Sequence, residues 1–429
     1  MNRREACPGD LSNWKIRILG LVLATGPAWA ADLSLADRQA DFGEFVRDVT
    51  ENYAWPDRQE KPWLSWQARY AGAVVAADSK ESLANVIATA LDELHDFHAE
   101  VRSRHPNRWL PVPTFADVWA TPEKDAARVI AVREGSDAQR AGIAPGDVVL
   151  RIGQTPVPAA IDGRLTAAVD TREAQARAWA LLSLLAGRAD EERHFTIRDA
   201  RGRVRDVTLP LERRFDRDQK PVSVRRLADD IGLIRFNNSI GQQATVAAFD
   251  AALEELRATR GLILDLRDVP SGGDSSVALG IMGRFVSGSM LPYQRHRIPD
   301  YGQPDVERNW LELVAPRGPF TYAAPVVALV DHWTGSMGEG MAIGLDAMHR
   351  ATVVGTPMAH LAGAVGEFHL AHSGIDVAFA TEQLYHVDGT LRQDWLPPIR
   401  VPEPTTSAAV LVRGREQLEQ ILGSTGSGH

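Results

Sequence analysis

The chain of 429 residues contains almost no cysteine, no long apolar run and no excess of positive charge. Its single cysteine, Cys7, lies near the amino terminus, so the rest of the chain has no disulfide, no thiol nucleophile and no thiolate metal site. The net charge of −9 argues against nucleic acid as a partner, because phosphate backbones bind basic surfaces. An enzyme of this composition must use serine, threonine, a carboxylate or a metal.

The remaining composition is that of an ordinary globular protein, with 44% hydrophobic and 24% charged residues. A chain of this length exceeds one compact core, so we expect two or three folding units.

The first thirty residues have the pattern of a signal peptide. Basic residues precede a short apolar run at 18–23, and Ala28-Trp29-Ala30 forms a small-x-small cleavage site. The run is far shorter than the about 20 apolar residues that span a bilayer, although an uncleaved anchor is the alternative. We therefore expect cleavage after Ala30, no stable membrane insertion after it, and a periplasmic or secreted protein that begins near Ala31.

The mature chain divides by its hydrophobic pattern. Residues 31–110 carry apolar side chains at helical spacing and predict an amino-terminal helical segment. From 111 to 215 short apolar runs are broken by glycine and proline, which predicts a β-rich domain. In 225–422 strand and helix patterns alternate, which predicts an α/β core around a largely buried sheet. The Gly/Ser-rich residues 423–429 predict a flexible tail.

The β-rich domain contains a stretch that resembles a PDZ domain. Residues 134–147, between predicted strands at 129–132 and 148–152, read as a small-residue turn, a short helix and a Gly-Asp turn. Gly142 suits a positive φ at a helix end, and Gly146 suits the tight turn. The resemblance implies a PDZ-like module that recruits or gates peptide. We expect it to perform no chemistry, so that its removal spares the catalytic serine.

One serine stands where a catalytic hydroxyl is expected. Residues 325–335 read as a buried strand and a turn, and a helix then opens at Ser336. A hydroxyl at the positive end of a helix is exposed to a ligand, and the N–H of Met337 could bind a developing oxyanion. Serine is also a favoured N-cap, so a purely structural role is the alternative.

A second buried strand, 261–266, leads into the pair Gly272-Gly273, whose backbone can approach a ligand closely. Together the two segments resemble the tail-specific (C-terminal processing) serine peptidase family. In that family an Asp-Leu-Arg strand runs into a Gly-Gly turn that supplies an oxyanion donor, and the nucleophile has a Ser-x-x-Glu context, here Ser336 to Glu339. The resemblance covers residues from about 42 to 398. It implies a crotonase-like α/β core with an amino-terminal helical segment and an inserted PDZ-like domain.

The sequence departs from the family at the general base. The Ser-Lys branch carries a lysine 25 residues after the nucleophile, where this chain has Leu361, and no lysine follows Lys220. The other branch, which resembles tricorn-core peptidases, takes a histidine from a Leu-x-Asp-x-His motif. Residues 94–98 have that form, so the resemblance implies His98 as base, a role that suits a group titrating near neutral pH.

Three points stay open. In the tricorn-like branch a late acidic residue orients the histidine, and here that residue would be Asp394. The glycine turn is one residue longer than usual, so either Gly272 or Gly273 could donate to the oxyanion. Two other histidines, His332 and His360, lie near the nucleophile or near the position of the missing lysine.

The function that follows is an exported serine peptidase. Ser336 would attack a peptide carbonyl, His98 would transfer the proton, and Met337 with one of the two glycines would bind the oxyanion. We expect peptide or protein substrates, no cofactor and no metal, since no matched ligand set is present. A catalytically silent peptide-binding protein that kept the fold is the alternative.

Overall fold

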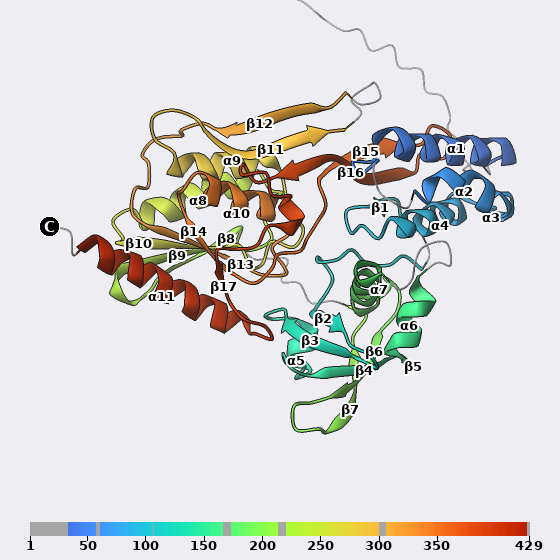
Figure 1. Ribbon diagram of the computed structural model, residues 1–429, viewed down its shortest axis with the longest axis horizontal. Helices are drawn as coiled ribbons and strands as arrows, with labels where there is room; N and C mark the ends of the chain where they lie inside the picture. Colours follow the sequence, from blue (N-terminus) through green and yellow to red (C-terminus); the bar gives the residue numbers. More distant parts are fainter. Residues whose placement is uncertain are drawn as a thin grey trace, which may run out of the picture. The chain divides into compact units, whose positions relative to one another are not determined.

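The computed structural model describes residues 33–56, 61–105, 107–165, 173–212, 220–299 and 306–426. The predicted signal peptide and the charged segment 213–219 lie outside the described residues. In the described ranges the fold is mixed α/β, with three sheets, two of six strands and one of five (Figure 1).

A mostly parallel sheet forms the core, in the order β17-β14-β13-β10-β9-β8. Only β8 runs antiparallel to its neighbour. The strands are β8 (Val222–Arg226), β9 (Ile231–Phe236), β10 (Gly261–Asp265), β13 (Val326–Val330), β14 (Thr352–Gly355) and β17 (Ile399–Arg400). The α-helices beside them are α8 (Ala244–Glu255), α9 (Ser275–Met282), α10 (Met337–Ala347) and α11 (Ser407–Gly426), and short 3₁₀ turns are η2 (Ala228–Asp230), η3 (Gly283–Phe285) and η4 (Arg392–Asp394).

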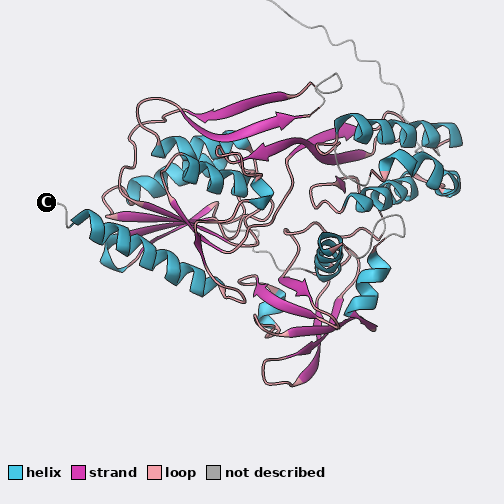
Figure 2. Ribbon diagram, in the orientation of Figure 1, coloured by secondary structure: helices cyan, strands magenta, loops and turns pink. Residues whose placement is uncertain are grey.

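Helices cover both faces of this sheet, which explains its nearly continuous apolar strands. Helices α8, α9 and α10 lie on one face and α11 on the other (Figure 2). Alternate residues of each strand serve the two layers: in β10, Leu264 joins the cluster under α8 to α10, whereas Ile263 joins the cluster under α11.

Helix α11 continues to Gly426, so the first four residues of the predicted flexible tail, 423–426, are helical, and residues 427–429 lie outside the described residues. The helix is held by its apolar face, where Val410 and Leu418 are buried against the sheet. This packing sustains helical hydrogen bonds into a stretch whose composition alone disfavours them.

A second sheet, β1-β16-β11-β12 with β15 beside β16, is antiparallel and was not predicted. Its strands are β1 (Glu100–Val101), β11 (Leu291–Ile298), β12 (Arg308–Val314), β15 (Ala364–His369) and β16 (Asp376–Tyr385). Strand β16 packs under the predicted amino-terminal helices through Val377 and Phe379. These helices are α1 (Leu35–Asn52), α2 (Trp63–Arg69), α3 (Ala71–Ala76) and α4 (Lys80–Leu91), followed by η1 (Asp92–Leu94).

The third sheet, in the order β2-β3-β4-β6-β7 with β5 beside β4, belongs to the segment predicted to be β-rich. We call residues 107–212 the β2–β7 module. Its strands are β2 (Val118–Pro122), β3 (Ala127–Val132), β4 (Val148–Ile152), β5 (Thr155–Pro156), β6 (Arg193–Arg198) and β7 (Val204–Leu209), and its helices are α5 (Asp137–Arg140), α6 (Val157–Arg164) and α7 (Ala174–Ala186). Helix α7 packs against this sheet through Trp179 and Leu182.

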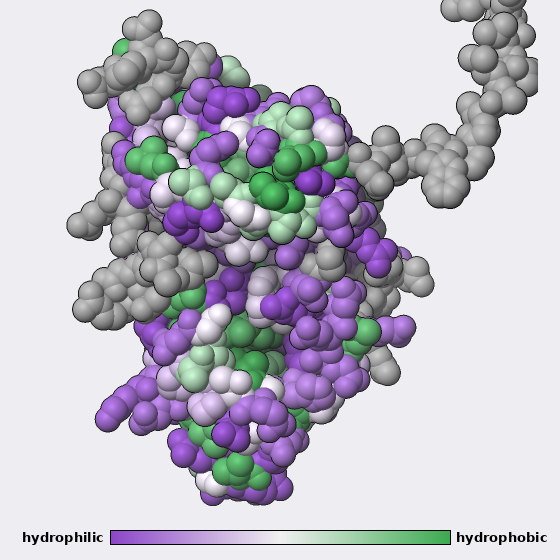
Figure 3. Space-filling model, turned by 90° about the vertical axis from the view of Figure 1, so that its right-hand side faces the viewer, coloured by the Kyte–Doolittle hydropathy of each residue, from purple (hydrophilic) through white to green (hydrophobic). Residues whose placement is uncertain are grey.

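The face that carries α1–α4 and the β2–β7 module is a mosaic of hydrophilic and hydrophobic side chains (Figure 3). Within the described ranges, no helix combines the length and apolar character needed to cross a membrane.

Candidate active site

Ser336 lies in a sharp turn between strand β13 and helix α10. Its backbone has φ 49° and ψ −112°, a left-handed φ that is costly for a residue with a side chain. The N–H of Ser336 donates to the Glu339 carboxylate at 2.8 Å, which ties the turn to the first turn of α10. A strained strand-to-helix turn of this kind holds a serine hydroxyl outside the helix.

The glycine turn, residues 268–273, packs directly against Ser336. Gly272 has φ +63°, and a Cβ placed on it would lie 2.4 Å from the Cβ of Ser336 and 3.0 Å from the backbone nitrogen of Met337. Gly273 is equally constrained, because its Cβ would lie 2.3 Å from the carbonyl carbon of Ile240. Both glycines are therefore required sterically.

The two glycines differ in the use of their N–H groups. The N–H of Gly272 donates to the carbonyl of Val269 at 3.0 Å, which closes the turn. Gly273, like Ser336 and Met337, lines a cavity of about 660 Å³. Gly272 is thus committed to the turn, and Gly273 is the glycine of the pair that lines the cavity.

His98 lines the same cavity as Ser336. It follows η1, where His95 adopts a left-handed backbone (φ 47°), and its own N–H donates to the Asp96 carboxylate at 2.9 Å. Its Nδ1 lies 2.7 Å from the carbonyl oxygen of Ala362. A carbonyl only accepts, so Nδ1 carries the proton, and in the neutral ring Nε2 can accept a proton.

Burial, assisted by the positive charge of Arg392, lowers the pKa of His98 to about 4. The ring is therefore neutral near pH 7, the state that a general base requires.

The other predicted candidates lie elsewhere. Asp394 is exposed in η4, and the positive charges that act on His98 belong to Arg392 and Arg102. Among the described residues, no hydrogen bond or ion pair joins Asp394 to His98, and Nδ1 of His98 is engaged by the carbonyl of Ala362. His360 is exposed, with Nδ1 on the carbonyl of Gln393, and neither it nor His332 is among the residues that line the cavity.

Sequence reasoning missed Glu339 as a titrating group beneath the nucleophile. The carboxylate is fully buried and accepts from the N–H groups of Ser336 and Leu361. Burial raises the pKa of Glu339 to about 7, against the opposing charge of Arg392. Arg392 is itself buried and donates to the carbonyls of Leu361 and Gly363, so it braces the segment that holds the His98 ring.

A charged network on the second sheet, also missed, lines the cavity. His296 lies between two carboxylates, with Nδ1 2.7 Å from Glu382 and Nε2 2.9 Å from Glu312. Burial alone would lower the pKa of His296, but the two carboxylates outweigh it and raise the pKa. Burial works against ionisation of Glu312 as well, yet hydrogen bonds led by that from His296 lower its pKa to about 2. Both ring nitrogens are engaged, so His296 is not a free base.

No local signal could have revealed this network. Its members come from strands β11, β12 and β16, which the sequence analysis did not predict, and none belongs to a motif.

Comparisons with known proteins relate the sequence and the fold to serine peptidases. Residues 230–396 match the model of peptidase family S41, a span that includes Ser336, the glycine turn and Asp394. No curated protein sequence matches the chain.

Solved structures resemble most of the chain in fold. The structure of mature CPAF complexed with lactacystin has a TM-score of 0.58 at 14% identity, and the match covers 90% of this chain and 98% of that one. The photosystem II D1 C-terminal processing protease has a TM-score of 0.55 at 19% identity, with 90% and 97% covered. At such identities the likeness is one of fold.

Proposed function

From the premise that this chain is a serine-type peptidase with an S41 family region at 230–396, we propose that it is an exported enzyme that cleaves peptide bonds through an acyl-enzyme on Ser336. The observation that carries the proposal is the convergence of Ser336, His98 and Gly273 on one cavity.

The same groups act in both steps of the reaction, acylation of Ser336 and hydrolysis of the acyl-enzyme. Ser336 Oγ attacks the peptide carbonyl carbon while Nε2 of His98 takes the hydroxyl proton. The tetrahedral oxyanion is bound by the N–H groups of Gly273 and Met337. The C–N bond breaks, His98 gives its proton to the leaving amine, and water then hydrolyses the ester with His98 again acting as base.

The finer assignments belong to the same proposal. The β2–β7 module is a PDZ-like domain that recruits or gates peptide, and the core is crotonase-like. The enzyme belongs nearer to the tricorn-like branch than to the Ser-Lys branch, because Leu361 stands at the lysine position and His98 lines the cavity. Asp394 is left without the orienting role, since Ala362 already engages Nδ1 of His98.

Labelling by a fluorophosphonate tests the proposal, because an activated serine is phosphonylated whereas an inert N-cap serine is not. We expect labelling of the wild-type protein at Ser336 and none of Ser336→Ala, with hydrolysis of fluorescent casein lost in parallel. Intact Ser336 that resists the label in a folded protein would instead indicate a silent peptide-binding protein.

Export and cleavage of the signal peptide are tested separately from catalysis. We expect amino-terminal sequencing of material from the cell exterior or periplasm to begin near Ala31, as the Ala-Trp-Ala site predicts. A membrane-bound chain that begins at Met1 would contradict this part of the proposal.

A further inference from the structure

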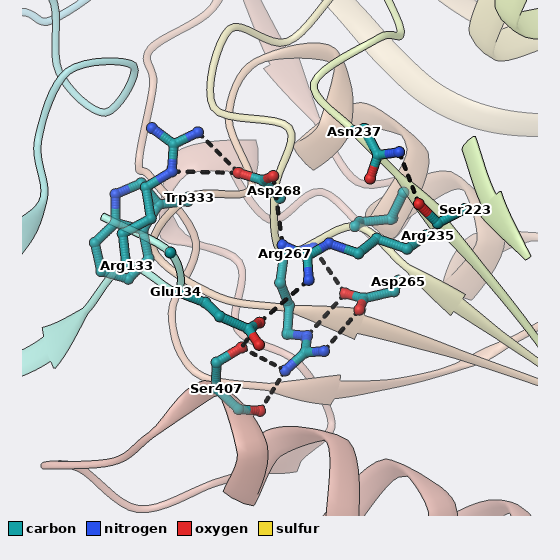
Figure 4. A network of polar contacts seen from close by, with 12 residues as sticks. Arg133, Glu134, Ser223, Arg235, Asn237, Asp265, Arg267, Asp268, Trp333 and Ser407 are labelled. Atoms are coloured by element: carbon teal, nitrogen blue, oxygen red, sulfur yellow. Dashed lines mark hydrogen bonds and ion pairs between the residues drawn. The ribbon is translucent and has the colours of Figure 1, made fainter. Parts of the chain in front are cut away.

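The β2–β7 module contacts the active-site turns directly, through Arg133 at the end of β3. Arg133 is 8% exposed. Its guanidinium reaches Asp268, the first residue of the glycine turn, with Nη2 at 2.8 Å and Nε at 3.2 Å from one carboxylate oxygen (Figure 4). A fork of two N–H groups on one carboxylate fixes direction as well as distance.

Arg133 also forms a hydrogen bond within the module. Its Nη1 donates to the carbonyl of Thr114 at 2.9 Å. The hydroxyl of Thr114 in turn lies 3.3 Å from that of Ser271, in the middle of the glycine turn. The module therefore contacts the turn at two points, through Arg133 after β3 and through Thr114 before β2.

Ala116, two residues after Thr114, contacts the turn that carries the nucleophile. Trp333, three residues before Ser336, is buried within the module's apolar cluster, and its indole N–H donates to the carbonyl of Ala116 at 2.6 Å. The two active-site turns are further joined to each other, since the N–H of Val269 donates to the carbonyl of Trp333. Removal of the module would take these contacts away from both active-site turns. The contacts therefore argue against the expectation that its removal spares the catalytic serine.

Asp268 is also held by residues of the core. The Asp268 carboxylate accepts a hydrogen bond from Nη2 of a second arginine, Arg235 in β9, at 3.4 Å. The backbone carbonyl of Asp268 accepts from the N–H of Asn238 at 2.7 Å. Arg235 and Glu134 continue the network at 3.2 Å toward helix α11 (Figure 4). Arg133 is thus the module side chain that contacts the Asp268 carboxylate directly.

We propose that Arg133 is a positioning residue that fixes the glycine turn, through Asp268, in the geometry in which the N–H of Gly273 meets the oxyanion. The inference rests on the proposed function. Loss of one oxyanion donor costs on the order of 100- to 1,000-fold in rate, so a displaced donor should cost a substantial part of that factor. Binding of substrate before the reaction should change little, because the oxyanion exists only in the transition state.

The test compares full-length Arg133→Gln, Arg133→Lys and Arg128→Gln with wild type. Arg128 is the matched control, since it lies on the same strand and forms an ion pair with Glu123 on the surface. With a fluorophosphonate series, we expect Arg133→Gln to lower the limiting phosphonylation rate about 10- to 100-fold and to leave the half-saturating concentration within about threefold. Arg133→Lys should recover part of the rate, and Arg128→Gln should match wild type.

Hydrogen exchange gives a second readout that needs no activity. The Gly272 amide, which closes the glycine turn on Val269, should exchange faster in Arg133→Gln than in wild type. If wild type is not labelled at all, the proposed function fails, and exchange at Gly272 alone still decides the positioning role.

A folded Arg133→Gln protein with wild-type phosphonylation rate and unchanged exchange would overturn the inference, as would an equal loss in Arg128→Gln. Should Arg133→Gln fail to fold, Asp268→Asn keeps the volume of the partner and removes its charge. The same loss of rate is then expected, and a wild-type rate would overturn the inference.

Discussion

At the scale of single residues, the active site depends on groups whose ionisation is set by burial. His98 has its pKa lowered to about 4 and Glu339 has its pKa raised to about 7, although both lie near Arg392. Burial disfavours the charged form of each, which is the cationic form for an imidazole and the anionic form for a carboxyl group. The two groups therefore titrate in different pH ranges, His98 near pH 4 and Glu339 near pH 7.

We expect His98→Ala to lower the acylation rate about a thousandfold or more, toward the level of Ser336→Ala, because the proton of Ser336 then has no acceptor. His360→Ala and His332→Ala are matched controls and should cost far less, since neither residue lines the cavity. Pre-steady-state acylation of all four variants makes the comparison. Near-normal turnover in His98→Ala together with collapse in His360→Ala would refute the assignment of the base.

The pKa of Glu339 predicts a pH-dependent difference in stability. Its pKa is raised from 4.5 to about 7 on folding, so its contribution to stability is present below pH 4.5 and is lost as the pH rises through 7. We expect Glu339→Gln, which cannot ionise, to gain stability relative to wild type between pH 5 and pH 8. Melting temperatures across this range measure the difference. The exposed Glu416→Gln serves as control, and a parallel trend in it would rule out Glu339 as the source.

At the scale of elements, two loops that follow parallel strands make the site. The glycine turn follows β10 and the nucleophile turn follows β13, and these strands are neighbours in the core sheet. The carboxyl ends of parallel strands meet at one edge, which is where such sheets bind ligands. The second sheet and η1 then supply the cavity wall and His98.

Gly272→Ala should abolish phosphonylation of Ser336, because the new methyl group would overlap the Ser336 side chain. Gly288→Ala is the control, since Gly288 has a similar φ of +77° but open space around its Cβ position. Both changes carry backbone strain of about 1–2 kcal/mol, so chemical denaturation should show comparable destabilisation from that source. Labelling of Gly272→Ala at the wild-type rate would contradict the packing of the turn on the nucleophile.

At the scale of the whole molecule, the described chain is held together by four apolar clusters joined through charged contacts. The β2–β7 module has its own cluster, which Trp333 of the core enters. Helix α11 closes the face of the core sheet opposite the site, and through Ser407 it meets Arg267, which follows β10.

Leu418→Ala should destabilise the protein by about 2–5 kcal/mol, because the side chain is fully buried beneath the core sheet and its loss leaves a cavity. Val412→Ala on the same helix is the control, since Val412 is 57% exposed and should cost far less. Urea denaturation with near-identical slopes for the variants gives the comparison. Equal midpoints for Leu418→Ala and wild type would show that α11 does not stabilise the core.

The sequence by itself determined the elements whose patterns are local. Strand β4 has the predicted bounds, 148–152, and α10 begins directly after Ser336 as the strand-turn-helix pattern indicates. The histidine motif at 94–98 also singled out a residue that lines the cavity with Ser336. These features depend on periodicity, on glycine and on short motifs, all of which are legible along the chain.

Only the tertiary structure decided the features that join distant segments. The commitment of the Gly272 N–H to its own turn, the carbonyl of Ala362 in place of Asp394 beside His98, and the clamp of Arg133 on Asp268 each depend on which surfaces meet. The titration of Glu339 likewise comes from burial, which residue type and spacing do not specify. The physical reason is common to all four: hydrogen bonding and desolvation act over a few ångströms in space, whatever the separation along the chain.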